Sequence, residues 1–183
     1  MSPDISERAS KIKLLLMDVD GVLTDGTITF LPGPEGQWVE TKPFDTQDGL
    51  ALQWLHRFGI KTGVISGRKS PAVELRASTG HMSYCYQGHL EKIPIIEEIL
   101  ADAKISADEV AYIGDDFTDV VIFNRVGWAI AVGNARAEVK QSADYVTAAR
   151  GGHGALREVT EMLLKAQGHW DTILTHYEIG REE

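Results

Sequence analysis

Two groups of closely spaced carboxylates have the chemistry to hold a cation against an anionic substrate. The segment DVDG at residues 18–21 follows the apolar run Lys13–Met17, and GDDFTD at residues 114–119 follows the apolar run Val110–Ile113. Adjacent carboxylates repel one another, and a bound cation removes that repulsion. Oxygen ligands suit Mg²⁺, which favours sites shared with phosphate, although Mn²⁺ accepts the same ligands. Either group alone is explained equally well as helix-capping or turn acids, but together they indicate a metal site.

Two further positions supply groups suited to holding phosphate oxygens. The run Lys61–Ile65 ends in Ser66-Gly67-Arg68, where a hydroxyl and exposed backbone N–H groups precede a helix. Lys92 stands in the first turn of another helix, where the helix dipole disfavours a positive charge unless an anion is near. Each signal alone is weak, because Ser-Gly-Arg is a common turn and a lysine is normally a surface residue.

An alternation of strands and helices would bring these groups together. Short apolar runs predict strands, and amphipathic stretches between them predict helices. Because such an alternation gives parallel strands with right-handed crossovers, the fold class is α/β, a three-layer sandwich with a mainly parallel, Rossmann-like sheet. The carboxyl ends of the strands, where ligands bind in such sheets, then carry both acidic groups. The predicted strands are Lys13–Met17, Lys61–Ile65, Ser83–Tyr86, Val110–Ile113 and Trp128–Val132, and the predicted helices cover Asp48–Phe58, a segment from Pro71 to Gly80, a segment around Ile93–Leu100, and Ala155–Gln167.

One segment, residues 26–44, interrupts this alternation. Its centre, PGPEG, consists of turn-forming residues, so we predict a β-hairpin inserted after the first strand. A hairpin is marginal in water by itself, and its apolar side chains need a surface on their own domain or on another subunit. Residues 168–183 form a polar arm that could dock elsewhere. Residues 1–183 are otherwise predicted to be a single domain. The apolar side chains of the hairpin are Ile28, Phe30, Leu31, Trp38 and Val39.

The composition limits the cellular compartment and the kinds of binding partner that we expect. The chain has 183 residues, 43% of them hydrophobic, a formal net charge of -9 and one cysteine. The negative charge disfavours nucleic acid and anionic membranes as partners. A single cysteine cannot form an internal disulfide, which favours a reducing, cytoplasmic location. No apolar run approaches the roughly 20 residues that a membrane-spanning helix needs.

The ordered set of motifs resembles the haloacid dehalogenase-like phosphatase superfamily. The match consists of DxDGxLTD at residues 18–25, Ser66, Lys92 and GDDxxD at residues 114–119. Within that superfamily, the chain is similar to the 3-deoxy-D-manno-octulosonate 8-phosphate phosphatases over most of its length. The features that carry this closer similarity are the hairpin, Asp48-Gly49, Ser66-Gly67-Arg68, Tyr86-Gln87-Gly88 and the segment GGHGALRE at residues 151–158.

The resemblance implies a phosphoric monoester hydrolase that works through an aspartyl-phosphate. Asp18 would be the nucleophile, and Asp20 would act as general acid and then as general base. Mg²⁺ would be held by the carboxylates of Asp18 and Asp115 and by the backbone carbonyl of Asp20. Ser66 would donate to a phosphoryl oxygen, and Lys92 would neutralise charge on Asp18 and the phosphoryl group.

Neighbouring residues receive supporting roles from the same resemblance. Asp119 would orient Lys92 or metal-bound water, and Asp116 would be a neighbour of the metal or a helix N-cap. The expected contacts to substrate are Asp48, Gly67, Arg68 and Arg181.

The sequence leaves no room for a large cap domain over the site. The resemblance therefore implies a homotetramer in which hairpins associate and neighbouring chains cover each site. Gln47 and the segment His89-Leu90-Glu91 depart from the basic character expected for binding an anionic sugar acid. These departures keep open a nonulosonate 9-phosphate phosphatase or a sugar phosphatase of relaxed specificity. A catalytically silent oligomerisation domain is disfavoured, because the key carboxylates and Lys92 are all present.

Overall fold

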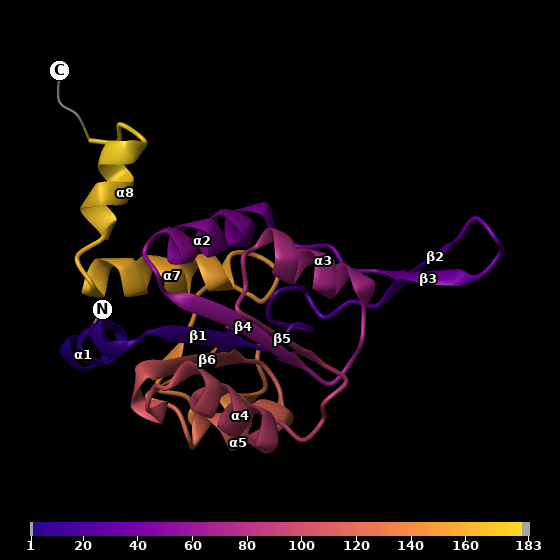
Figure 1. Cartoon of the computed structure of the whole chain (residues 1–183), viewed down its shortest axis with the longest axis horizontal. Coiled ribbons are helices and arrows are strands. Elements are labelled where there is room, and N and C mark those ends of the chain that lie inside the picture. The colour runs from indigo at the N-terminus through magenta and orange to yellow at the C-terminus, as the bar shows by residue number, and fades with distance from the viewer. Residues whose placement is uncertain (1, 181–183) are drawn as a thin grey trace.

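Six parallel strands within residues 2–180, the part of the chain that the computed structural model describes, form the sheet that organises the molecule (Figure 1). They run in the order β5-β4-β1-β6-β7-β8. β1 is central, and the chain leaves it to build first one half of the sheet and then the other. The carboxyl end of β1 therefore lies at a topological switch point, where ligands bind in such folds. The strands are β1 (Leu14–Met17), β4 (Lys61–Ser66), β5 (Tyr84–Gln87), β6 (Val110–Gly114), β7 (Trp128–Ala131) and β8 (Tyr145–Val146).

Helices cover both faces of this sheet, which gives the predicted three layers. In Figure 1, α2 (Thr46–Arg57), α3 (Pro71–Thr79) and α7 (Ala155–Ala166) lie on one side, and α4 (Ile93–Ala103) and α5 (Phe117–Phe123) on the other. The first helix, α1 (Pro3–Lys11), packs against α7, and α6 (Ala137–Gln141) packs beside α5. A short 3-10 helix, η1 (Ala107–Glu109), leads into β6.

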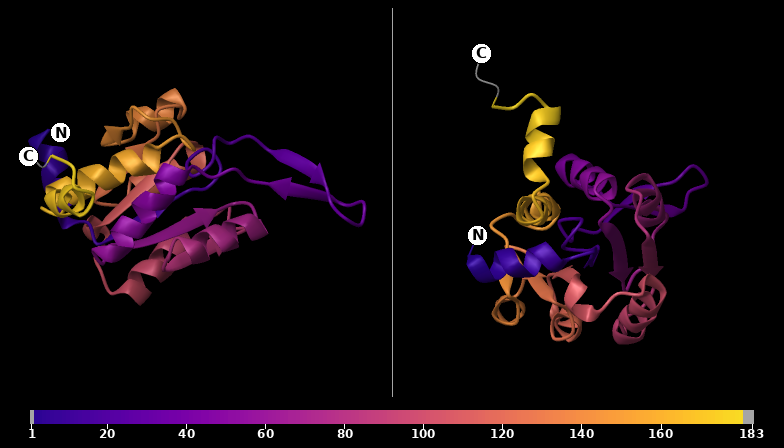
Figure 2. Two further views of the ribbon diagram at one scale, coloured as in Figure 1. Left: turned by 90° about the horizontal axis from the view of Figure 1, so that it is seen from above. Right: turned by 60° about the vertical axis from the view of Figure 1, so that its left-hand side comes forward.

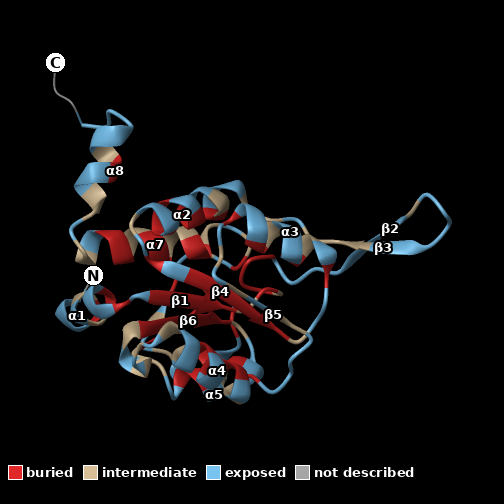
Figure 3. Ribbon diagram, viewed as in Figure 1, coloured by how far each residue is buried: buried red, intermediate tan, exposed pale blue. Residues whose placement is uncertain are grey.

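Burial explains why the strand runs are continuously apolar. Every residue of β1, β6 and β7 is buried, because helices cover both faces of the sheet (Figure 3). Trp128 and Tyr112 are the largest of the fully buried side chains. The core thus lies along the sheet and holds the strand ends in fixed register.

Local signals set the boundaries of the helices close to their predicted positions. The side chain of Asp45 caps α2 by accepting hydrogen bonds from the backbone N–H groups of Gln47 and Asp48. Pro71 occupies the first turn of α3, and Gly80 is its C-cap. α1, α5, α6 and α8 (Trp170–His176) were not predicted, and each is either strongly polar on one face or shorter than two turns.

The predicted hairpin consists of β2 (Thr29–Pro32) and β3 (Trp38–Thr41), which pair antiparallel. It projects from the sheet as a separate arm (Figure 2). Phe30 is 52% exposed and Trp38 is 71% exposed, so the hairpin does not fold onto its own domain. The alternative of another subunit as the packing surface remains a prediction.

The described part of the C-terminal arm, residues 168–180, docks on the chain's own α2. The ring of His169 stacks on Phe58 with centroids 4.4 Å apart, and Trp170 makes an edge contact with Trp54 at 5.8 Å. Tyr177 accepts a hydrogen bond from the indole of Trp54. Within residues 2–180, no helix combines the length and the apolar character that a membrane crossing requires.

Candidate active site

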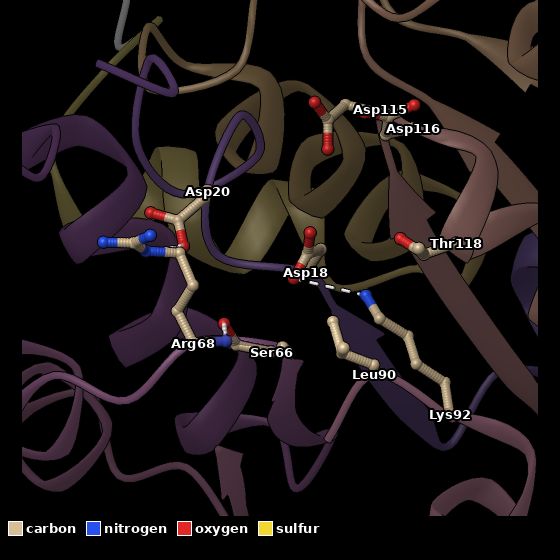
Figure 4. A pocket seen from close by; sticks show the side chains of 10 residues that line it. Asp18, Asp20, Ser66, Arg68, Leu90, Lys92, Asp115, Asp116 and Thr118 are labelled. Carbon is tan, nitrogen blue, oxygen red and sulfur yellow. Dashed lines mark hydrogen bonds and ion pairs between the residues drawn. The ribbon is translucent and has the colours of Figure 1, made fainter. Parts of the chain in front are cut away.

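A cavity of about 180 Å³ opens at the carboxyl ends of β1, β4 and β6 (Figure 4). Both acidic groups, the Ser-Gly-Arg turn and the lysine meet there, although they come from four separate regions of the sequence. The lining residues are Asp18, Asp20, Ser66, Gly67, Arg68, Leu90, Lys92, Asp115, Asp116 and Thr118. Leu90 and Thr118 were not predicted as site residues.

Asp18 and Lys92 form an ion pair on the floor of this cavity (Figure 4). The Nζ atom of Lys92 lies 3.3 Å from Oδ1 of Asp18. Burial raises the pKa of Asp18 to about 6, and Lys92 opposes that shift. Burial also acts to lower the pKa of Lys92, but the charges of Asp18 and Asp119 outweigh it and raise that pKa above the ordinary value. The pair is thus an ionised nucleophile candidate beside a permanent cation.

Asp119 is fully buried and holds Lys92 in place. Its Oδ1 atom accepts hydrogen bonds from Lys92 Nζ at 2.7 Å and from the hydroxyl of Tyr112 at 2.8 Å. Its Oδ2 atom accepts the backbone N–H groups of Asp115 and Asp116. Since both oxygens are engaged, Asp119 acts on the site through its neighbours rather than as a free ligand.

Asp115 is the carboxylate best placed to add to a cation site. Oxygens of Asp18, Asp115 and Asp119 lie within 4.8 Å of one another. Among the described residues no hydrogen-bond donor reaches the buried Oδ1 atom of Asp115. Burial, together with the charges of Asp119, Asp18 and Asp116, raises the pKa of Asp115 to about 7. An orphaned, buried carboxylate oxygen beside other carboxylates fits Mg²⁺, which takes hard oxygen ligands.

The loop after β1 is held in shape by glycines. Gly21 has φ of +94°, and a Cβ there would lie 2.2 Å from Oδ2 of Asp115. A Cβ on Gly151 would lie 1.6 Å from the carbonyl oxygen of Gly21, and Gly152 donates its N–H to the carbonyl of Val22. The turn at residues 151–154 therefore packs directly behind this loop, a placement that the sequence did not reveal.

The Ser-Gly-Arg turn closes the opposite wall of the cavity. Ser66, at the end of β4, is 2% exposed, and its hydroxyl accepts the backbone N–H of Arg68. A Cβ on Gly67 would lie 2.8 Å from a methyl group of Leu90. Arg68 lies at the rim with its guanidinium near Asp20 (Figure 4).

Two charged residues near the site were not predicted from the sequence. Lys42 and Glu40 come from the base of the hairpin, and Lys42 forms ion pairs with both Asp20 and Glu40. Burial acts against ionisation of Glu40, but hydrogen bonds from Lys42 and Arg68 lower its pKa overall. The available sequence signal is that Glu40, in β3, and Lys42, just after it, stand at alternate positions, which puts them on one face but does not show that this face meets Asp20.

One expected substrate contact, Asp48, does not lie at the cavity. Asp48 is fully buried near the start of α2, where its Oδ1 atom accepts the backbone N–H of Arg157 at 2.8 Å. Burial raises its pKa to about 6. Its place beneath α7 corrects the expectation that Asp48 contacts substrate. Arg181 lies outside the described residues.

Asp116 lines the cavity and also caps α5, accepting the N–H of Phe117.

Comparison with known proteins shows which protein family has this arrangement of residues. The profile of the haloacid dehalogenase-like hydrolase family matches residues 64–158. The 3-deoxy-D-manno-octulosonate 8-phosphate phosphatase of Escherichia coli (strain K12) is 39% identical over 171 residues, which cover 93% of this chain and 89% of that protein. The chain belongs to the haloacid dehalogenase-like hydrolases.

Solved structures of similar proteins agree with this family assignment. The 3-deoxy-D-manno-octulosonate 8-phosphate phosphatase of Moraxella catarrhalis, solved with magnesium, phosphate and KDO, is 38% identical with a TM-score of 0.91, covering 97% of this chain and 99% of that one. The corresponding Yersinia pestis phosphatase is 37% identical with a TM-score of 0.88, covering 93% of this chain and 90% of that one. The predicted fold class and the predicted enzyme class, a phosphoric monoester hydrolase, are both confirmed.

Proposed function

We propose that this hydrolase removes the phosphate from 3-deoxy-D-manno-octulosonate 8-phosphate, in a Mg²⁺-dependent reaction through an aspartyl-phosphate. The single observation that carries the chemistry is the ion pair of Asp18 and Lys92 on the floor of a cavity lined by Asp115 and Ser66. The choice of substrate is supported by the 39% identity to phosphatases of that name over 93% of the chain.

In the proposed first step, a carboxylate oxygen of Asp18 attacks phosphorus in line and the sugar alkoxide leaves. Asp20, on the same loop, gives its proton to that leaving oxygen. Attack by water on the aspartyl-phosphate, with Asp20 now accepting a proton, then releases phosphate and restores Asp18. Both residues line one small cavity, as this sequence of steps requires.

The remaining residues stabilise charge in this mechanism. Lys92 faces the phosphoryl oxygens and Asp18, and Ser66 donates its hydroxyl to the phosphoryl group. Gly67 and Arg68 line the same cavity and are assigned to substrate contact. Asp119 fixes the position of Lys92 through their 2.7 Å contact.

Mg²⁺ is assigned to the carboxylates of Asp18 and Asp115 and the backbone carbonyl of Asp20. Bound there, the ion supplies positive charge that offsets the charge spreading over the phosphoryl oxygens. The unpartnered Oδ1 atom of Asp115 supports this assignment, as does the magnesium in the Moraxella catarrhalis phosphatase.

A homotetramer completes the proposal, with neighbouring chains covering a cavity over which residues 2–180 build no cap domain. The exposed apolar side chains of the hairpin support this arrangement, since they find no partner surface on their own domain. The single cysteine, Cys85, supports a cytoplasmic location.

The test is phosphate release from a panel of sugar phosphates with Mg²⁺ and with EDTA. The panel contains 3-deoxy-D-manno-octulosonate 8-phosphate and a nonulosonate 9-phosphate, and the Asp18→Asn variant runs beside the wild type. Metal-dependent turnover that favours the octulosonate is the expected result. Faster turnover of the nonulosonate would retain the mechanism and replace the substrate, an outcome that the exposed Leu90 at the cavity makes worth measuring. Inactivity of folded, Mg²⁺-loaded protein on every ester would refute the proposal.

A further inference from the structure

The base of the hairpin reaches the catalytic cavity, whereas its tip faces solvent. Glu40, in β3, and Lys42, just after it, stand at alternate positions, so their side chains share a face. The side chain of Lys42 is only 4% exposed and that of Glu40 17%, in contrast to Trp38 near the tip, which is 71% exposed. The two charged residues are therefore built into the domain.

Four charges at this point form a closed ring. Lys42 pairs with Oδ1 of Asp20 and lies 3.1 Å from Oε1 of Glu40. The other oxygen of Glu40 pairs with the guanidinium of Arg68, whose Nε atom lies 3.8 Å from Oδ2 of Asp20. With Asp20 ionised, the state in which it leaves the first proposed step, the ring is electrically neutral, with two carboxylates and two cations. Burying a lysine costs free energy unless its charge is paired. Removing one residue of the ring therefore leaves its neighbours as buried charges without a partner.

The ring holds the carboxylate of Asp20 at both ends. Oδ1 faces Lys42 and Oδ2 faces Arg68, so rotation of the carboxylate about its bond moves an oxygen away from a cation. Arg68 lines the cavity, but Lys42 is not among the described residues that line it. Lys42 contacts Asp20 and Glu40, so its effect on the cavity runs through Asp20.

We propose that Lys42 is a positioning residue that orients Asp20 for proton transfer, so that the hairpin base forms part of the catalytic apparatus. This inference rests on the proposed role of Asp20 as general acid. A general acid must lie within hydrogen-bond reach of the leaving oxygen, and correct placement contributes about 10²–10⁴-fold to such steps. Loss of Lys42 releases one end of the carboxylate and lowers the fraction of molecules in that geometry.

The dependence on the leaving group separates positioning from general damage to the site. A sugar alkoxide is strongly basic and leaves with a proton, whereas p-nitrophenolate leaves without one. Misplacement of Asp20 must therefore slow cleavage of a sugar phosphate far more than the first cleavage of p-nitrophenyl phosphate. A structural defect at Asp18 or Lys92 would slow both.

The experiment compares Lys42→Met, which keeps most of the aliphatic stem, with the wild type in single turnovers with enzyme in excess over ester. The substrates are 3-deoxy-D-manno-octulosonate 8-phosphate, or the panel sugar phosphate that the wild type cleaves fastest, and p-nitrophenyl phosphate. We expect sugar release to fall by about 10–100-fold and p-nitrophenolate release by less than about threefold. Lys61→Met, at the exposed start of β4 away from the cavity, is the matched control and should change neither rate.

Equal losses on the two esters, or no loss on either, would overturn the assignment of Lys42. Lys42→Arg keeps the positive charge and should recover much of the rate of sugar-phosphate cleavage. It provides an independent test if the Lys42→Met variant does not fold. An arginine variant that folds but shows equal losses on both esters would also contradict the inference. Failure of the proposed function is seen separately, in a wild type that cleaves no ester with Mg²⁺.

Discussion

The Nζ atom of Lys92 lies 3.3 Å from Oδ1 of Asp18, and on its other side it touches the buried Asp119. The two carboxylates differ in their surroundings. Asp119 is saturated with hydrogen-bond donors, whereas burial raises the pKa of Asp18 to about 6. One acid thus stabilises the fold, and the other is kept in a costly environment that suits a nucleophile.

An amide substitution of Asp18 should therefore affect mainly turnover, whereas an amide substitution of Asp119 should also lower the stability of the fold. Asp18→Asn should abolish turnover and change the free energy of unfolding by less than about 1 kcal/mol, because it removes a carboxylate whose burial is unfavourable. Asp119→Asn should lower stability by about 3 kcal/mol, because it breaks a buried pair and its hydrogen bonds. Urea unfolding beside phosphate release measures both quantities. Equal destabilisation by the two substitutions would contradict this division of roles.

Binding of Mg²⁺ should strengthen as the pH rises from 5.5 to 8. Burial and neighbouring carboxylates raise the pKa of Asp115 to about 7, so a proton must leave this group before a metal ion can bind at low pH. The Mg²⁺-induced increase in melting temperature should be larger at pH 8 than at pH 5.5. Asp115→Asn should remove the increase at both pH values. A pH-independent shift would place the ion elsewhere.

Because of Asp48, the free energy of unfolding should decrease as the pH rises between its unfolded and folded pKa values. Burial raises that pKa from 3.8 to about 6, so between these values the folded chain holds a proton that the unfolded chain has released. Stability then decreases as pH rises through the window and levels off above it. Asp48→Asn lacks this loss and keeps an acceptor for the N–H of Arg157. In EDTA, its advantage over wild type should grow by about 1–3 kcal/mol from pH 4 to 7, as measured by urea unfolding.

The contact between Gly151 and Gly21 should not tolerate a methyl group. A Cβ on Gly151 would lie 1.6 Å from the carbonyl oxygen of Gly21. Gly151→Ala should lower stability by about 2–4 kcal/mol and displace the catalytic loop, so that kcat falls in the folded fraction. Gly154 has φ of +88° and open space around it, so Gly154→Ala should cost about 1–2 kcal/mol with little change in kcat. A fully active Gly151→Ala variant would show that the backing turn has no bearing on the loop.

Assembly should depend on the exposed hairpin. Trp38, which is 71% exposed, lies near its tip, and Trp38→Glu places a charge where the proposed tetramer buries apolar surface. Light scattering after size exclusion should show a smaller species for this variant than for wild type. Leu75→Glu, on the exposed face of α3, serves as the matched control and should leave the assembly unchanged. A wild type that is monomeric at every concentration would remove this part of the proposal.

The elements that the sequence predicted well are those specified by local patterns. The strand at Leu14–Met17 was within one residue of its prediction because complete burial makes the run continuously apolar. Gly80 and Pro71 marked the ends of one helix for reasons that operate within a single turn. α8 was missed because its apolar residues are few and it depends on contact with α2, in particular with Trp54.

The parts of the site that escaped prediction depend on contacts between distant segments. Nothing near Lys42 in sequence shows that the hairpin base turns back towards Asp20. Asp48 was expected to contact substrate because of the family resemblance, yet α7 covers it and its carboxylate accepts the backbone N–H of Arg157. Asp18 and Asp115 were predictable as neighbours because each follows the end of a parallel strand, and β1 lies beside β6 in the sheet.

The turn at residues 151–154 also bears on the order in which a working enzyme emerges from the ribosome. Every charged group that lines the cavity has been synthesised once residue 116 is made. The glycines that press against the back of the catalytic loop, however, are added only afterwards, just before α7. A nascent chain therefore carries every charged group of the site 35 residues before Gly151 is added to hold the catalytic loop in shape.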